Sequence, residues 1–88
     1  MDILNLEGTM NFSTVDHNNL NTLSVSEFAK AEPNLSSEAY ELLKKNIIEN
    51  GMLNPVIVFN NEVYDGRHRL KVANEIKCDL KIIETTTI

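Results

Sequence analysis

The sequence predicts an α+β fold with a small mixed sheet and two main helices. Three observations lead to this fold class. An amphipathic helix is expected over residues 36–50, a strand hairpin over 56–64, and a second helix over 66–76 that leads into a strand at 79–84. The N-terminal third favours strands but is less regular. With 88 residues, the chain is expected to form a single domain.

The N-terminal third combines short apolar runs with turn residues. A first hairpin is expected from Ile3–Leu6 and Met10–Val15, because the turn residues Glu7-Gly8 separate these two short runs. Leu23–Val25 is expected to be a short strand, and Phe28–Ala31 a helical turn that stops before Pro33.

The first long helix is predicted by its cap and by its apolar spacing. Asn34 or Ser36 is the expected N-cap, and Gly51 is the expected left-handed residue after the last turn. Between them, one apolar stripe repeats every four residues, at Ala39, Leu43 and Ile47.

The hairpin and second helix follow directly. Val56–Phe59 is expected to be a buried strand, Asn60-Asn61 a two-residue turn, and Glu62–Tyr64 the returning strand. The helix that begins after Asp65-Gly66 is expected to be two-sided. Its apolar side carries Leu70, Val72, Ala73 and Ile76, and its polar side carries Arg67, Lys71 and Asn74.

The formal net charge of -5 argues against a general nucleic-acid binder, so DNA binding is expected to be unlikely. The charge is unevenly distributed. Residues 1–29 contain four acidic residues and no lysine or arginine, whereas residues 64–81 contain five basic residues. A local basic site near the second helix is therefore compatible with an acidic chain.

The cysteine and hydropathy patterns favour a cytoplasmic protein without a membrane partner. Cys78 is the single cysteine, so an internal disulfide is impossible, and we expect it to be a small buried apolar side chain. A Cys/His metal site is not expected, because His17 and His68 are distant in sequence. The first residues lack the pattern of a secretory signal, and no apolar stretch is long enough to span a membrane.

The stretch "DGRHR", Asp65–Arg69, is the strongest chemical signal. A strand that ends at a glycine and leads into a helix exposes backbone N–H groups, and the helix dipole favours an anion there. Gly66 lets a ligand approach the backbone closely. Cations at a helix N-terminus are locally unfavourable. The presence of Arg67, His68 and Arg69 there therefore indicates that a negative group, such as a phosphate, binds beside them.

A structural interpretation explains the same residues without a ligand. Asp65 caps the helix, Arg69 pairs with Asp65 or Glu62, and His68 is a surface histidine or one with satisfied hydrogen bonds. From the residues alone, the anion site and the structural ion-pair cluster both stay open.

The order of three motifs points to a known group of proteins. A helix ends in "IIENGMLNPVIV" (Ile47–Val58), a short hairpin "FNNEVY" follows, and "DGRHRLKVA" (Asp65–Ala73) opens the next helix. Residues 36–73 resemble the ParB/sulfiredoxin-like superfamily clearly, and residues 22–84 resemble it loosely. Residues 1–20 match nothing in it. The resemblance implies that the glycine turn holds the phosphates of a nucleotide.

Branches of this superfamily differ at the turn. In the chromosome-partition branch it reads Gly-Glu-Arg-Arg and binds CTP; Gly66 and Arg69 match, and the helix-turn-helix domain of that branch has no room in this chain. In sulfiredoxin it reads Gly-Cys-His-Arg; Arg67 stands in place of the catalytic cysteine, which excludes that reduction.

Two further branches are closer to this sequence. Free-serine kinases have Asp-Gly-His-His-Arg, from which only Arg67 departs, and Glu32 lies at a place comparable to their activating carboxylate. Small stand-alone ParB-like proteins of phages and mobile elements read Asp-Gly-Arg-(His/Asn)-Arg and fit best in size.

The resemblance and the residues together predict a small ParB-like domain that binds a nucleotide or another phosphate ligand, from a phage or mobile element. The expected cofactor is a nucleoside di- or triphosphate with Mg²⁺, held by Asp65, Gly66, Arg67, His68 and Arg69. If chemistry occurs, Glu32 is the candidate catalytic base. The alternative is a protein-binding module, an inhibitor or adaptor of a basic host protein, that keeps the fold without the chemistry.

Overall fold

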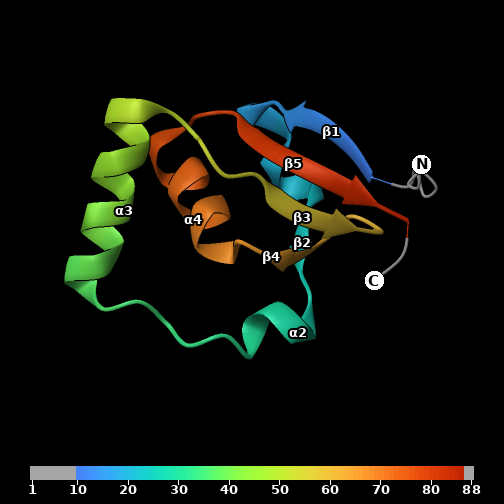
Figure 1. Ribbon diagram of the computed structural model, residues 1–88, viewed down its shortest axis with the longest axis horizontal. Coiled ribbons are helices and arrows are strands. Elements are labelled where there is room, and N and C mark those ends of the chain that lie inside the picture. Colours follow the sequence, from blue (N-terminus) through green and yellow to red (C-terminus); the bar gives the residue numbers. More distant parts are fainter. Residues whose placement is uncertain (1–9, 87–88) are drawn as a thin grey trace, which may run out of the picture.

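A five-stranded mixed sheet with the strand order β1-β5-β3-β4-β2 forms the centre of the protein (Figure 1). The structure is a computed structural model, and it describes residues 10–86. In chain order the elements are β1 (Met10–Val15), the 3-10 helix η1 (His17–Thr22), β2 (Ser24–Val25), α2 (Glu27–Lys30), α3 (Ser37–Asn50), β3 (Val56–Phe59), β4 (Glu62–Asp65), α4 (Arg67–Ile76) and β5 (Leu80–Thr85). The predicted α+β class, with a mixed sheet and two main helices, is confirmed.

Strand pairing brings the first and last strands of the described residues together. β1 pairs antiparallel with β5, from Met10 opposite Thr85 to Val15 opposite Leu80. The strand predicted over Met10–Val15 is therefore confirmed, and its partner within residues 10–86 is the last strand. The other half of the predicted first hairpin, Ile3–Leu6, lies outside the described residues.

The inner strands follow the expected hairpin. β3 and β4 are antiparallel, with a register shift between Ile57 and Val58, and β5 lies parallel to β3. The two-residue turn between β3 and β4 has positive φ at Asn60 (52°) and Asn61 (62°), which asparagine tolerates better than most residues.

Serine side chains start two of the helices. The Ser36 hydroxyl accepts a hydrogen bond from the backbone N–H of Ala39 at 3.1 Å, so Ser36 is the N-cap of α3 rather than Asn34. Ser26 caps α2 in the same way, through the N–H of Ala29 at 3.1 Å. The end of α3 was also predicted correctly, since Gly51 has a φ of 82°.

The core lies between α4 and one face of the sheet. Val56, Val58 and Val63 from β3 and β4 are fully buried, and Val72 and Ala73 meet them from α4. α3 packs against α4, so the two long helices lie beside each other next to the sheet (Figure 1). Each buried aliphatic side chain of this size contributes roughly 1.5–3 kcal/mol.

Cys78 lies at the margin of the core, and two phenylalanine side chains lie outside it. Cys78 is half-buried and packs against the core, where burial raises the pKa of its thiol. Phe12 and Phe28 are 76% and 73% exposed, and Phe28 stacks on Tyr64 with ring centroids 6.3 Å apart.

Within residues 10–86, no helix has the length and apolar character needed to cross a membrane.

Candidate functional site

The turn between β4 and α4 is shaped by Gly66. Its φ of 95° and ψ of 27° place it in the left-handed region, and it is the N-cap residue of α4. Unlike α2 and α3, α4 has no side-chain hydrogen bond at its N-cap. The predicted cap role of Asp65 is therefore wrong, because Asp65 is still the last residue of β4 and is exposed.

Neighbouring side chains also leave little space for a side chain at Gly66. A Cβ atom at this position would meet Nη2 of Arg69 and Cγ2 of Val56, each at 3.0 Å. The turn consequently combines a left-handed residue, tight packing beneath it, and a ten-residue helix whose first N–H groups lack a side-chain cap. Such a helix start can accept an anion.

Arg67 ties the turn to the segment between α2 and α3. Its Nε donates to the carbonyl of Ala29 at 3.0 Å, and its Nη2 donates to the carbonyl of Glu32 and to the side-chain oxygen of Asn34 at 3.1 Å. Three acceptors in α2 and the loop after it therefore hold the guanidinium, which is a structural role that the sequence did not predict. Its positive charge still lies at the start of α4.

The His68 side chain, like that of Arg67, lies beside the loop that follows α2, and it is mostly buried. Its Nδ1 lies 4.0 Å from Oε1 of Glu32, its side chain is 14% exposed, and its Nε2 is buried without a hydrogen-bond partner. Burial lowers the pKa of His68 below its ordinary value, the charge of Arg67 lowers it further, and the carboxylate of Glu32 opposes both effects. The simple picture of a surface histidine or one with satisfied hydrogen bonds is wrong, since one buried ring nitrogen has no partner.

Arg69 turns away from the other two side chains. Its Nη2 donates to the carbonyl of Pro55 at 3.2 Å, and its Nε is buried without a partner. No ion pair joins it to Asp65 or Glu62 in the part of the chain that the structure describes, so the predicted structural pairing is wrong. The three basic side chains of the turn thus do not converge on a single point.

The structure brings Glu32 to the turn, as the sequence comparison led us to expect. Glu32 follows the short helix α2, and its carboxylate, 44% exposed, lies next to His68. Its backbone carbonyl accepts from Arg67. Of the six predicted site residues, Glu32, Arg67 and His68 therefore form one cluster, Asp65 and Gly66 form the turn beside it, and Arg69 lies beneath.

A cavity of about 220 Å³ adjoins this cluster between α3 and α4. It is lined by Asn34, Leu35, Ser37, Tyr40, Glu41, Arg67, His68 and Lys71. The sequence reasoning did not include Lys71 in the site, although it placed Lys71 one helical turn after Arg67 on the same side of the helix. It could not identify the α3 residues, because their approach to α4 is a tertiary contact.

Tyr40 also lines this cavity, and it belongs to a network of charged side chains. Nζ of Lys71 lies 5.0 Å from the Tyr40 ring centroid, a cation–π distance. The Tyr40 hydroxyl donates to Glu75 at 2.7 Å, and Lys44 donates to the other oxygen of Glu75 at 2.7 Å. Burial, together with the hydrogen bond to Glu75, raises the pKa of Tyr40 to about 12, so Tyr40 is a neutral donor at physiological pH.

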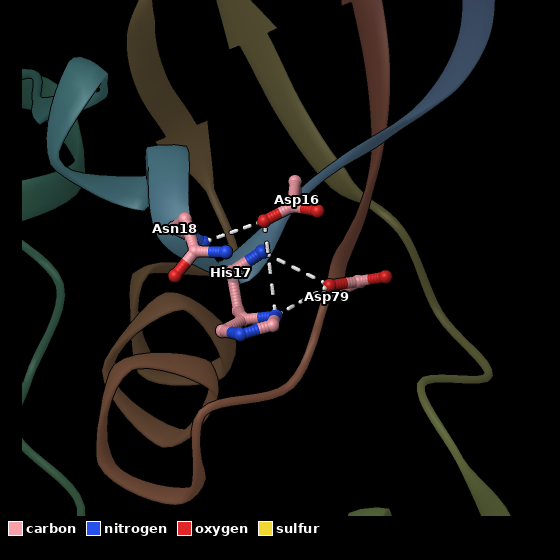
Figure 2. A network of polar contacts seen from close by, with 4 residues as sticks. All are labelled: Asp16, His17, Asn18 and Asp79. Atoms are coloured by element: carbon pink, nitrogen blue, oxygen red, sulfur yellow. Dashed lines mark hydrogen bonds and ion pairs between the residues drawn. The ribbon is translucent and has the colours of Figure 1, made fainter.

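A second polar cluster lies at the other end of α4. His17 Nδ1 is 3.1 Å from Oδ1 of Asp79 and 3.8 Å from Oδ1 of Asp16, and the backbone N–H of His17 donates to Asp79 at 2.9 Å (Figure 2). Among residues 10–86, these three residues have side-chain N and O atoms within 4.8 Å of one another, a spacing that could hold a metal ion. All three are exposed, and Asp16 also accepts from the N–H of Asn18 as the N-cap of η1.

Solved structures define the class of this fold. The pNOB8-like ParB N-domain matches with a TM-score of 0.71 at 23% identity over 91% of this chain, and the same kind of domain in its C222₁ crystal form matches with a TM-score of 0.73 at 21% identity, also over 91%. The protein therefore has a ParB N-domain fold, and the predicted ParB-like resemblance is confirmed at that level.

The likeness is limited in extent. The chain spans about a third of the length of these solved chains, 31% and 29%. No known family profile matches the sequence, and no curated protein matches it. At this identity the likeness shows the fold alone.

Proposed function

We propose that the chain is a single ParB-like domain whose β4–α4 turn binds the phosphate of a nucleotide. One observation carries this proposal: the uncapped start of α4 adjoins a cavity of about 220 Å³ that three basic side chains line, those of Arg67, His68 and Lys71. Two of these residues carry permanent charge, and the Nε2 of His68 is buried without a partner. A phosphate supplies both negative charge and acceptor oxygens.

Each residue of the site has a proposed role. The backbone after Gly66 approaches the phosphate, and His68 and Lys71 contact it from α4. Arg67 adds positive charge while it holds the loop, and Arg69 supports the turn from below. Exposed Asp65 is available to Mg²⁺ carried by the nucleotide.

Glu32 is the proposed base if the bound phosphate undergoes transfer. A carboxylate beside a phosphate site raises the electrostatic cost of binding. A task such as accepting the proton of an attacking hydroxyl would explain why it is there. Glu32 lies 4.0 Å from His68 and is 44% exposed, so a substrate can reach it. A cytoplasmic location and an origin in a phage or mobile element belong to the same proposal.

Calorimetric titration tests the proposal directly. We expect binding heat from at least one of ATP, ADP, CTP and GTP, measured with and without Mg²⁺. Lys71→Ala should weaken that binding by about tenfold, which corresponds to the loss of one charge-assisted contact. Lys45→Ala, an exposed position on α3, is the matched control and should bind like the original chain.

Absence of heat from all four nucleotides at millimolar concentration would remove the nucleotide claim. The protein-binding alternative would then gain support, and one observation already favours it. The side chains of Phe12 and Phe28 are exposed outside the core. Exposed apolar side chains of this kind can contact a protein partner. A deletion of residues 1–20 is unsuitable to test it, because it removes β1 and the buried core residue Leu20.

A further inference from the structure

The cluster of Asp16, His17 and Asp79 joins two parts of the chain that are far apart in sequence. Asp16 and His17 lie where β1 ends and η1 begins, and Asp79 lies directly before β5. The backbone and the ring of His17 both contact the carboxylate of Asp79, 62 positions away. Figure 2 shows that both carboxylates approach the same ring nitrogen, Nδ1 of His17.

The nitrogen and oxygen atoms of this cluster have the separations that one cation requires. Nδ1 of His17 lies 3.1 Å from Oδ1 of Asp79 and 3.8 Å from Oδ1 of Asp16. With metal–ligand bonds of about 2.1 Å, two ligand atoms on one transition metal lie roughly 3.0–4.2 Å apart, from a right angle to a straight line at the metal. Both measured distances fall within this range, so a cation needs little movement of the side chains.

Backbone donors hold both carboxylates in place. The N–H of Asn18 donates to Oδ1 of Asp16 at 2.8 Å, and the N–H of His17 donates to Oδ1 of Asp79 at 2.9 Å. Hydrogen bonds of this kind orient metal ligands before the metal binds. The side chains of the cluster are 41% to 54% exposed, so a cation can reach them and water can complete its coordination.

The negative charge of the cluster has no permanent counter-charge among residues 10–86. No lysine or arginine of this range forms an ion pair with Asp16 or Asp79. By contrast, Glu27, Glu41 and Glu75 each pair with a lysine. Two carboxylates that converge on one nitrogen repel each other, and a divalent cation between them replaces this repulsion with attraction.

We propose that Asp16, His17 and Asp79 bind a divalent transition-metal cation, for which Zn²⁺ is the probe, with water in the remaining positions. An imidazole nitrogen together with carboxylate oxygens suits Zn²⁺, whereas Mg²⁺ prefers oxygen ligands alone. This is not the Cys/His type of site that the sequence argued against, since two of the three ligands are aspartates. The cation ties the end of β1 to the start of β5, and closing so long a loop stabilises the folded chain.

Calorimetric titration of the untagged full chain with Zn²⁺, in the absence of nucleotide, tests this proposal. We expect one site, and a thermal denaturation midpoint that rises with Zn²⁺ concentration. His17→Gln and Asp79→Asn should each weaken binding by about tenfold or more, because each removes one ligand. Glu49→Gln removes one exposed negative charge from α3 and is the matched control, which should bind like the original chain. Cys78→Ala should also bind normally, because the thiol is not one of the ligands.

Paramagnetic Mn²⁺ provides a measurement that needs no variant, and it decides the matter if a variant fails to fold. Bound at this site, Mn²⁺ should broaden the NMR signals of residues 16–18 and 79 before those of the β4–α4 turn. Broadening centred elsewhere overturns the proposal. So does the absence of binding at millimolar Zn²⁺, binding that Cys78→Ala weakens and His17→Gln does not, or equal weakening by Asp79→Asn and Glu49→Gln.

Discussion

Arg67 and Ala29, which are 38 positions apart in the sequence, are joined by a hydrogen bond of 3.0 Å from the guanidinium Nε to the backbone carbonyl. This contact attaches the short helix α2 and the loop after it to the start of α4. It also brings Glu32 beside His68. The integrity of the candidate site therefore depends on one side chain that the sequence marked only as a charge.

Arg67→Ala should lower the free energy of unfolding by about 2 kcal/mol, because it removes charge-assisted hydrogen bonds to three acceptors in α2 and the loop after it. Arg67→Lys should recover little of this loss, since one ammonium group cannot reproduce the planar guanidinium contacts. Urea denaturation measures both variants. A change of less than about 0.5 kcal/mol for Arg67→Ala, within the range of ordinary surface substitutions, would contradict the structural role.

Gly66→Ala should destabilise the protein by about 2 kcal/mol, through both the left-handed backbone and the Cβ contacts at 3.0 Å. Gly66→Asn separates the two causes. Asparagine tolerates a left-handed backbone but still carries a Cβ atom. If the lack of space beside Val56 dominates, as the geometry indicates, thermal denaturation will show similar losses for both variants; a nearly native Gly66→Asn would point to backbone strain alone.

Lys77→Gly should stabilise the protein by about 0.5–1 kcal/mol. Lys77 ends α4 with φ 59° and ψ 52°, a left-handed conformation that costs a residue with a Cβ atom about 1–2 kcal/mol and costs glycine almost nothing. Part of this gain is offset by the greater freedom of glycine in the unfolded chain. Lys77→Ala keeps the Cβ atom and is the control, so a gain in its stability equal to that of the glycine variant would refute this explanation.

The protonation of His68 should be linked to both folding and phosphate binding. Burial and the charge of Arg67 lower the folded pKa below the ordinary value of 6.5, so the unfolded chain binds more protons than the folded one between the two values. The stability contributed by neutral His68 is therefore present above pH 6.5 and is lost as the pH falls through the folded pKa.

Proton NMR titration of the histidine rings measures this pKa, with His17→Gln to assign the signals. We expect Glu32→Gln to lower the pKa of His68 further, because the carboxylate raises it. A bound phosphate at the proposed site should raise it, as any nearby negative charge does. A His68 pKa that does not respond to nucleotide would place the ligand elsewhere.

The cap and turn residues explain why much of the fold was predictable. Ser36, Gly51 and the Asn60-Asn61 turn act through their own backbones, so the bounds of α3 and of the β3–β4 hairpin follow from local chemistry. The end of α4 was predicted correctly at residue 76, but the left-handed conformation of Lys77 after it was not predicted. The partner of β1 was also hidden, since strand pairing across most of the chain depends on packing rather than on local pattern.

Sequence alone determined the fold class, the two main helices and the glycine turn that begins α4, because periodicity, caps and turn residues act over a few neighbouring positions. Tertiary structure decided which groups meet at that turn. It turned Arg67 and His68 toward Glu32, sent Arg69 beneath Gly66 toward Pro55, and placed Tyr40 and Lys71 around one cavity. These choices depend on where long, flexible side chains find acceptors from distant segments, and local sequence does not contain that information.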